Sequence, residues 1–180
     1  MTKVSKEQTL DSEHIYKGRV VSLRVDSVEL PSGRKTIREI VEHGTCTAIV
    51  AIDSKQNVLL VKQYRKPVEM NLLEIPAGNV EQDEDPLDCA RRELEEETGF
   101  SAKNWEKLGF FYTSPGFSTE AMYLYLATKL KPVKRTADYD EEIELVRVPL
   151  SKVTELIDSG EVCDAKSIAG LLLALQKVKR

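Results

Sequence analysis

The sequence predicts an α/β chain of the α+β type, in which an antiparallel β-hairpin precedes a larger domain of strands and helices. Short segments with apolar or alternating strand character recur along most of the chain. Residues 86–98 and 164–178 instead place apolar side chains at the three- and four-residue steps of a helix. With a length of 180 residues, these observations predict a hairpin extension over residues 1–43 and one main domain over residues 44–180.

Composition narrows the class of protein. Hydrophobic residues make up 41% of the chain, which is enough for a core, and no apolar run approaches the roughly 18–20 residues of a membrane span. The net charge of −4 argues against a general nucleic-acid binder. The polar N-terminus shows no signal peptide, and three scattered cysteines without metal-site spacing fit a reducing compartment. We therefore expect a cytoplasmic protein with neither a membrane nor a nucleic acid as partner.

The N-terminal extension is predicted to form two strands. Residues 15–30 contain alternating apolar and polar side chains, residues 31–33 form a turn, and residues 36–42 form the second strand. Residues 1–13 are expected to be a loose polar end. A two-stranded hairpin is marginal in water, so we expect this one to pack on its own domain or on a partner subunit.

The main domain begins with an apolar run at residues 45–52, which is typical of a central strand, and residues 58–64 form the next strand. Further strands are expected at about residues 106–113, 121–128 and 142–148. Ser151 is expected to cap a short helix. The last helix is expected to bury one apolar stripe, made of Ile168, Leu171, Leu172 and Leu175.

The helix at residues 86–98 has strong local signals at both ends. Asp85 can serve as its N-cap, Pro86 suits the first helical position, and Gly99 suits the left-handed residue just beyond the end. Apolar and small residues at helical steps mark the face toward the core: Leu87, Ala90, Leu94 and Thr98.

A second stripe of this helix carries the carboxylates of Glu93, Glu96 and Glu97. Like charges at this spacing destabilise a helix by roughly 0.2–0.5 kcal/mol per pair, and a bound divalent cation would reverse that effect. Magnesium takes oxygen ligands from a few carboxylates and from substrate phosphates. On charge alone, a solvated acidic helix face is the other interpretation.

The spacing around this helix is specific. Gly78 is followed after five residues by Glu84, after seven more by Arg92-Glu93-Leu94, and then by Glu96-Glu97 and Gly99-Phe100. This pattern resembles the Nudix box without a departure. The resemblance implies a mixed β-sheet sandwiched between helices, and the Mg²⁺-dependent hydrolysis of a nucleoside diphosphate linked to another group.

The resemblance and the helical spacing together suggest roles for the box residues. Glu93 and Glu97 are expected to bind the metal, Glu96 to be a further ligand or a bridge to a second ion, and the carbonyl of Ala77 to complete the set. Gly78 would allow close backbone approach with an unusual dihedral angle. Arg92 matches the arginine that holds a catalytic carboxylate, and Glu84 matches a glutamate with either a loop-supporting or a catalytic role. Mn²⁺ remains an alternative to Mg²⁺.

Residues outside the box suggest the substrate. Pro115 lies sixteen positions after Gly99, and with the segments 38–43, 62–65 and 73–78 it resembles the ADP-ribose pyrophosphatase subfamily. That resemblance implies hydrolysis of ADP-ribose, a nucleotide-sugar substrate, to AMP and ribose 5-phosphate. Another nucleoside diphosphate sugar or dinucleotide remains an alternative. So do a non-catalytic ADP-ribose sensor and an enzyme on RNA ends or nucleoside triphosphates.

The subfamily also implies substrate-binding residues and a dimer. Arg38 and Arg65 would contact the adenosine or diphosphate, Glu120 the terminal ribose or the catalytic loop, and Tyr16 the adenine. The catalytic base would come from a later acidic segment, where Glu141 is preferred over Glu142, although that segment could equally be a solvated lead-in to a strand. The hairpin would be exchanged across a homodimer.

Overall fold

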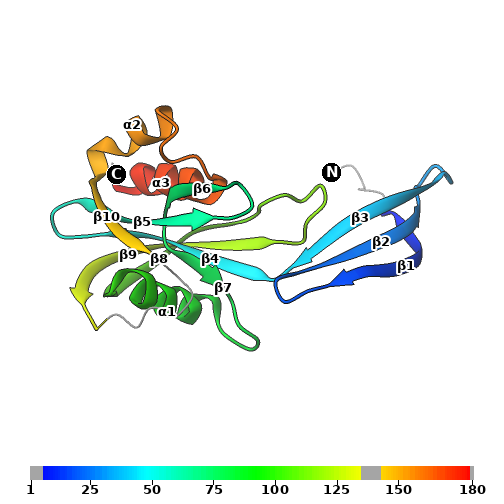
Figure 1. Cartoon of the computed structure of the whole chain (residues 1–180), viewed down its shortest axis with the longest axis horizontal. Coiled ribbons are helices and arrows are strands. Elements are labelled where there is room, and N and C mark those ends of the chain that lie inside the picture. The colour runs from blue at the N-terminus through cyan, green and yellow to red at the C-terminus, as the bar shows by residue number, and fades with distance from the viewer. Residues whose placement is uncertain (1–5, 135–142, 179–180) are drawn as a thin grey trace. The chain divides into compact units, whose positions relative to one another are not determined.

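The computed structural model describes residues 6–134 and 143–178 (Figure 1). The chain divides into two compact units. The N-terminal unit comprises Met1–Gly44 with Tyr112–Ala121, and the main unit comprises Thr45–Phe111 with Met122–Arg180. Each unit has its own sheet.

The N-terminal unit is a three-stranded antiparallel sheet of β1 (Gln8–Lys17), β2 (Val21–Glu29) and β3 (Lys35–His43). The expected hairpin is present as β2 and β3. The expectation of a loose end through residue 13 was wrong, because β1 begins at Gln8. Every residue of β1 is exposed, so no apolar alternation marks it in the sequence. The buried carboxylate of Asp26 accepts a hydrogen bond from Ser12 at 2.7 Å, which ties β1 to β2.

The loop around Pro115 belongs to this same unit. Val41 of β3 donates its backbone N–H to Phe117 at 2.8 Å and accepts one from Thr119 at 3.0 Å. Thr119 also accepts a hydrogen bond from the backbone of His43 at 2.9 Å. The loop therefore lies along the end of β3, the strand that carries Arg38.

The main unit is built on a seven-stranded sheet in the order β10-β5-β4-β9-β8, with β6 paired to β5 and β7 paired to β4. Its strands are β4 (Thr45–Ile52), β5 (Asn57–Arg65), β6 (Met70–Glu74), β7 (Ala77–Asn79), β8 (Phe100–Tyr112), β9 (Ala121–Pro132) and β10 (Glu144–Pro149). The strand expected at about residues 106–113 begins earlier, at Phe100, directly after the preceding helix. Only Gly99 separates the end of that helix from the start of β8.

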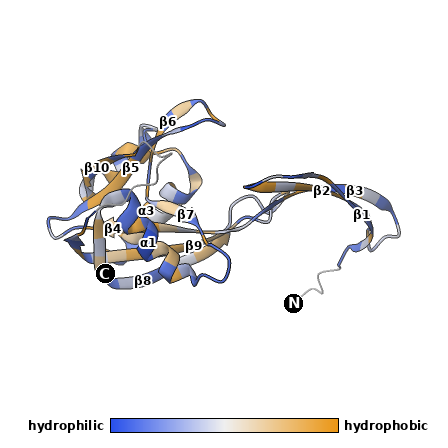
Figure 2. Ribbon diagram, turned by 60° about the horizontal axis from the view of Figure 1, so that its bottom comes forward, coloured by the Kyte–Doolittle hydropathy of each residue, from blue (hydrophilic) through white to orange (hydrophobic). Residues whose placement is uncertain are grey.

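Two helices cover opposite faces of this sheet, which confirms the predicted fold class (Figure 1). Val50 of β4 packs in one apolar cluster with α3 (Ala165–Val178). The preceding residue, Ile49, packs in the other cluster with α1 (Pro86–Thr98). Such alternation follows from the two-residue period of a strand. In Figure 2 the central strands are largely hydrophobic, whereas α1 is largely hydrophilic.

The ends of α1 are as predicted. Asp85 accepts a hydrogen bond from the backbone N–H of Leu87 at 2.8 Å, and Gly99 adopts the left-handed conformation with φ of 72°. The predicted cap of the short helix was wrong. A 3-10 turn, η1 (Leu150–Lys152), precedes α2 (Val153–Asp158), and Ser151 lies inside that turn.

The buried stripe of α3 differs in one position from the prediction. Leu171 is buried and Ile168 and Leu175 are partly buried, but Leu172 is 43% exposed. α3 instead approaches the sheet closely at Gly170, where an added Cβ would lie 2.9 Å from Cδ1 of Ile75. Among the described residues, no helix is both long and apolar enough to cross a membrane.

Candidate active site

The site is assembled where β7 passes across the carboxylate stripe of α1. A Cβ added at Gly78 would lie 1.9 Å from the carboxyl carbon of Glu93. Any side chain at position 78 would therefore displace the glutamate, which confirms the expected close approach. The expected unusual dihedral angle was wrong, because Gly78 is not among the described residues with positive φ. The glycine is needed for space.

Glu97 contacts the residue that precedes Gly78 in β7. Its side chain is almost fully buried, and its Oε2 accepts a hydrogen bond from the backbone N–H of Ala77 at 3.0 Å. A buried carboxylate is costly unless it is hydrogen-bonded or paired with a cation. The structure therefore places two carboxylates of α1, those of Glu93 and Glu97, against two consecutive residues of β7.

Arg92 connects Glu93 to two other glutamates of the box, Glu84 and Glu96. It donates to Glu84 at 3.0 and 3.1 Å, to Glu93 at 2.7 Å and to Glu96 at 3.0 Å. It also donates to the carbonyl of Asn79 at 3.2 Å, which ties α1 to the end of β7. One guanidinium thus contacts three carboxylates that would otherwise repel one another.

These ion pairs shift the protonation equilibria. The hydrogen bonds from Arg92 lower the pKa of Glu84 to about 2, and the same contacts raise the pKa of Arg92. Glu84 also accepts a hydrogen bond from the backbone of Glu81 at 3.0 Å, so it supports the loop before α1. Burial raises the pKa of the neighbouring Cys89 thiol to about 12, which keeps it protonated and excludes it as a nucleophile at neutral pH.

Arg65 lies at the end of β5, where its Nε donates to Glu74 of β6 at 2.7 Å. The other oxygen of Glu74 accepts from Lys166 of α3 at 2.5 Å. The sequence predicts a role for Arg65 but none for Glu74 or Lys166. Glu74 lies in the segment 73–78 that carries the subfamily resemblance, whereas nothing in the local sequence marks Lys166, which is 92 positions away.

The other predicted substrate residues belong to the N-terminal unit. Arg38 forms an ion pair with Glu7 at 2.6 Å, and Tyr16 is 58% exposed. Glu120 accepts a hydrogen bond from Thr113 at 2.5 Å, and Pro115 lies in the turn that Ser114 and Phe117 close. Glu141 and Glu142 lie outside the described residues.

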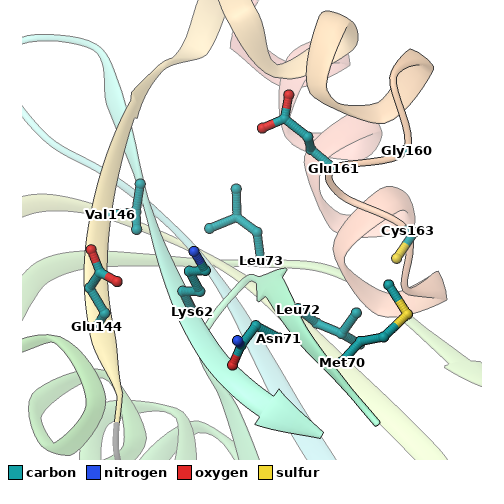
Figure 3. Close-up of a pocket in the computed structure, with 10 residues that line it drawn as sticks. All are labelled: Lys62, Met70, Asn71, Leu72, Leu73, Glu144, Val146, Gly160, Glu161 and Cys163. Carbon is teal, nitrogen blue, oxygen red and sulfur yellow. The ribbon is translucent and has the colours of Figure 1, made fainter. Parts of the chain in front are cut away.

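A cavity of about 500 Å³ lies away from the carboxylates of the box (Figure 3). It is lined by β5, β6 and β10 and by the segment between α2 and α3, and it contains no residue of the box. Leu73 and Val146 of its lining pack in the same apolar cluster as α3, on the face of the sheet opposite α1. The cavity is therefore separate from the carboxylate site.

Two family models together match residues 7–171 of the chain. Residues 42–171 match the NUDIX domain, and residues 7–41 match the nucleoside diphosphate sugar hydrolase N-terminal domain. Each match corresponds to one of the two sheets.

Individual relatives cover nearly the full length. The chain is 44% identical to an ADP-ribose pyrophosphatase of Bacillus subtilis (strain 168), over 92% of this chain and 90% of the relative. It is 43% identical to a methanol dehydrogenase activator of Bacillus methanolicus, over 93% of this chain and 92% of the relative. A crystal structure of an ADP compounds hydrolase superposes with a TM-score of 0.90 at 23% identity, over 99% of this chain and 97% of that one, and so supports the fold.

Proposed function

The chain belongs to the NUDIX family, and from that premise we propose that it hydrolyses the pyrophosphate bond of ADP-ribose to AMP and ribose 5-phosphate with Mg²⁺. The observation that carries this proposal is the gathering of the box carboxylates of α1 against Ala77 and Gly78. The 44% identity to an ADP-ribose pyrophosphatase over nearly the whole chain supports the choice of substrate.

The donor set fits a hard divalent cation. Glu93, Glu96 and Glu97 supply carboxylate oxygens from one helix, and Ala77 supplies a backbone carbonyl from the strand that α1 touches. Oxygen ligands of this kind suit Mg²⁺, and Mn²⁺ takes similar ligands. The missing side chain at Gly78 leaves room for the carboxylate of Glu93 beside the strand. When bound, the ion would neutralise the charge of the pyrophosphate and orient the attacking water.

The chain's own residues would set the geometry around the ion. Arg92 holds Glu93 and Glu96 in place and restrains Glu84, so we assign it a catalytic role through the carboxylates that it contacts. Glu96 would act as a ligand or as a bridge to a second ion. For the base that activates water we propose Glu141, with Glu142 as the alternative.

Substrate recognition is assigned to two sets of residues. Arg65 presents a guanidinium held by Glu74, a group that suits a diphosphate or the face of a base. From the N-terminal unit, Arg38 would contact the adenosine or the diphosphate, and Tyr16 would contact the adenine. Glu120, in the Pro115 loop, would contact the terminal ribose or the catalytic loop. The solvent-exposed ring of Tyr16 is consistent with a stacking role.

We propose a homodimer in which residues 1–43 are exchanged and residues 44–180 form the hydrolase domain. Exposed apolar side chains on the three-stranded sheet support this assembly, among them Ile37 at 61% exposure. Sedimentation of the full chain should give a dimer, and Ile37→Glu should shift it toward monomer. A monomer at all concentrations would contradict the assembly. The three free cysteines support a reducing, cytoplasmic setting.

The substrate assignment is tested by an activity screen. ADP-ribose, GDP-mannose, NADH, FAD and dGTP are each incubated with the protein, with and without Mg²⁺, beside the variant Glu97→Gln. We expect metal-dependent release of AMP from ADP-ribose, and its loss in the variant. Turnover of another compound in place of ADP-ribose would replace the substrate but keep the reaction class. Binding without turnover of any compound would indicate a sensor.

A further inference from the structure

Lys166, at the start of α3, belongs to no motif and lies on the far side of the sheet from the box helix. We propose that Lys166 is a positioning residue, which acts through Glu74 to hold Arg65 in the orientation that binds substrate. This inference rests on the proposed role of Arg65 and adds the element that fixes it.

The contacts form a short relay. Glu74 accepts from Arg65 at one oxygen, at 2.7 Å, and from Lys166 at the other, at 2.5 Å. Lys166 is held in turn by Asp164 at 2.9 Å. Two cations and two carboxylates alternate along this line, so its charges balance. Each oxygen of Glu74 has one cation, and the orientation of the carboxylate therefore depends on both.

The side chain at the Arg65 end of the relay is more exposed than the side chain at the Lys166 end. The side chains of Glu74 and Lys166 are 4% and 14% exposed, whereas that of Arg65 is 39% exposed. Arg65 donates to Glu74 through Nε, and the described residues provide no hydrogen-bond partner for the two terminal nitrogens of Arg65. The buried end of the relay is thus fixed, while its solvent end presents two nitrogen donors to a ligand.

The same region of α3 also holds the backbone that leads into the box. Ser167 accepts a hydrogen bond from the backbone N–H of Ile75 at 2.9 Å, in a fully buried position. The next residue, Pro76, accepts one from the backbone of Ile49 at 2.8 Å, and Ala77 donates to Glu97. Residues 74–77 are therefore restrained one after another, the first two of them by α3.

Removing Lys166 would leave one oxygen of a buried carboxylate without its cation. Glu74 would then turn toward solvent or toward the remaining cation, because a buried carboxylate is stable only when its oxygens are satisfied. Either movement shifts Arg65, which has no other anchor among the described residues. The effect should fall on substrate binding, because the metal-binding carboxylates are held separately by Arg92 and Ala77.

A double-mutant cycle tests the relay. We expect Lys166→Met to raise KM for ADP-ribose by about tenfold, the scale of one misplaced charge-assisted hydrogen bond, with kcat changed less than about twofold. In an Arg65→Ala background, the same substitution should have almost no further effect on KM. Lys152→Met is the matched control, since Lys152 forms an exposed ion pair with Glu155 in the same unit, and it should leave KM unchanged.

Equal effects of Lys166→Met in both backgrounds would overturn the proposal, because Lys166 would then act independently of Arg65. If Lys166→Met does not fold, Lys166→Gln takes its place, with the same direction and a smaller effect. A wild-type protein inactive on ADP-ribose would contradict the substrate assignment alone. NMR spectra of the arginine Nε–H groups then decide the relay without any substrate, because the signal of Arg65 should move in Lys166→Met and stay in Lys152→Met.

Discussion

The two long helices of the main unit have nearly the same length and both pack against the sheet, but they differ in the number of charged side chains that they carry. α1 and α3 contain 13 and 14 residues and cover opposite faces of one sheet. α3 buries an apolar line and carries its polar contacts near its two ends, at Lys166 in the first turn and at Lys177 in the last, whereas α1 carries a dense, largely half-buried set of glutamates and arginines. We therefore expect the buried apolar line of α3 and the carboxylates of α1 to be separable, so that packing and chemistry can each be disrupted alone.

The largest effect on chemistry is expected for Glu97→Gln. The amide oxygen can still accept the N–H of Ala77, so the free energy of unfolding should change little. Substitutions of residues that only support metal ligands cost about 10–100-fold, and a ligand should cost more, so kcat should fall by more than about a hundredfold. Steady-state kinetics at saturating Mg²⁺ and thermal unfolding of the same sample check both parts. A fully active variant would remove Glu97 from the metal site.

Leu171→Ala should produce the opposite pattern. Leu171 of α3 is fully buried, and truncating such a leucine lowers the free energy of unfolding by about 2–5 kcal/mol. Activity per folded molecule at low temperature should stay within about twofold of the wild type, because Leu171 packs in the apolar cluster on the face of the sheet opposite α1. Denaturant unfolding and kcat measure the two quantities. A loss of kcat larger than the loss of folded protein would show that α3 and the site are not separable at this position.

Gly78→Ala should reduce activity by about 10–100-fold, the range seen when a supporting residue of a metal site is changed. The added methyl group would lie 1.9 Å from the carboxyl carbon of Glu93, so the carboxylate must move away from β7. The Mg²⁺ concentration for half-maximal rate should rise accordingly. A titration of rate against Mg²⁺ checks this, and an unchanged midpoint would mean that the carboxylate has room to move without loss of the ion.

The smallest expected effect is on acid stability. The pKa of Glu84 is lowered from 4.5 to about 2, so its contribution to stability is fully present above about pH 4.5 and is lost as the pH falls through about 2. The difference in unfolding free energy between the wild type and Glu84→Gln should therefore narrow as the pH falls from 6 toward 2.5. Denaturant unfolding at several pH values measures this difference. A constant difference would argue against the ion pair with Arg92.

The sequence was most informative where structure depends on neighbouring residues. The caps of α1 and its buried residues Ala90 and Leu94 follow from spacing within one helix, and all were predicted correctly. Ser151 failed as a cap because a 3-10 turn precedes α2, and such a turn has no distinct sequence period.

Long-range partners could not be predicted. β1 has no apolar alternation and is fixed by polar contacts such as that of Ser12 with Asp26. Lys166 meets Glu74 across 92 positions, and no local pattern selects it over the other lysines. The clustering of the box glutamates could be predicted because they lie close together in the sequence, whereas the positions of the base and of the substrate residues outside the box depend on how distant segments meet.

The hold of α3 on residues 74 and 75 has a consequence for biosynthesis. Every residue of the box leaves the ribosome long before Lys166 and Ser167, which arrive only with the last helix. A nascent chain would therefore carry all the carboxylates while residues 74 and 75 still lack their contacts with α3. Residues 74 and 75 would therefore reach their final arrangement only after α3 has been synthesised and has docked on the sheet.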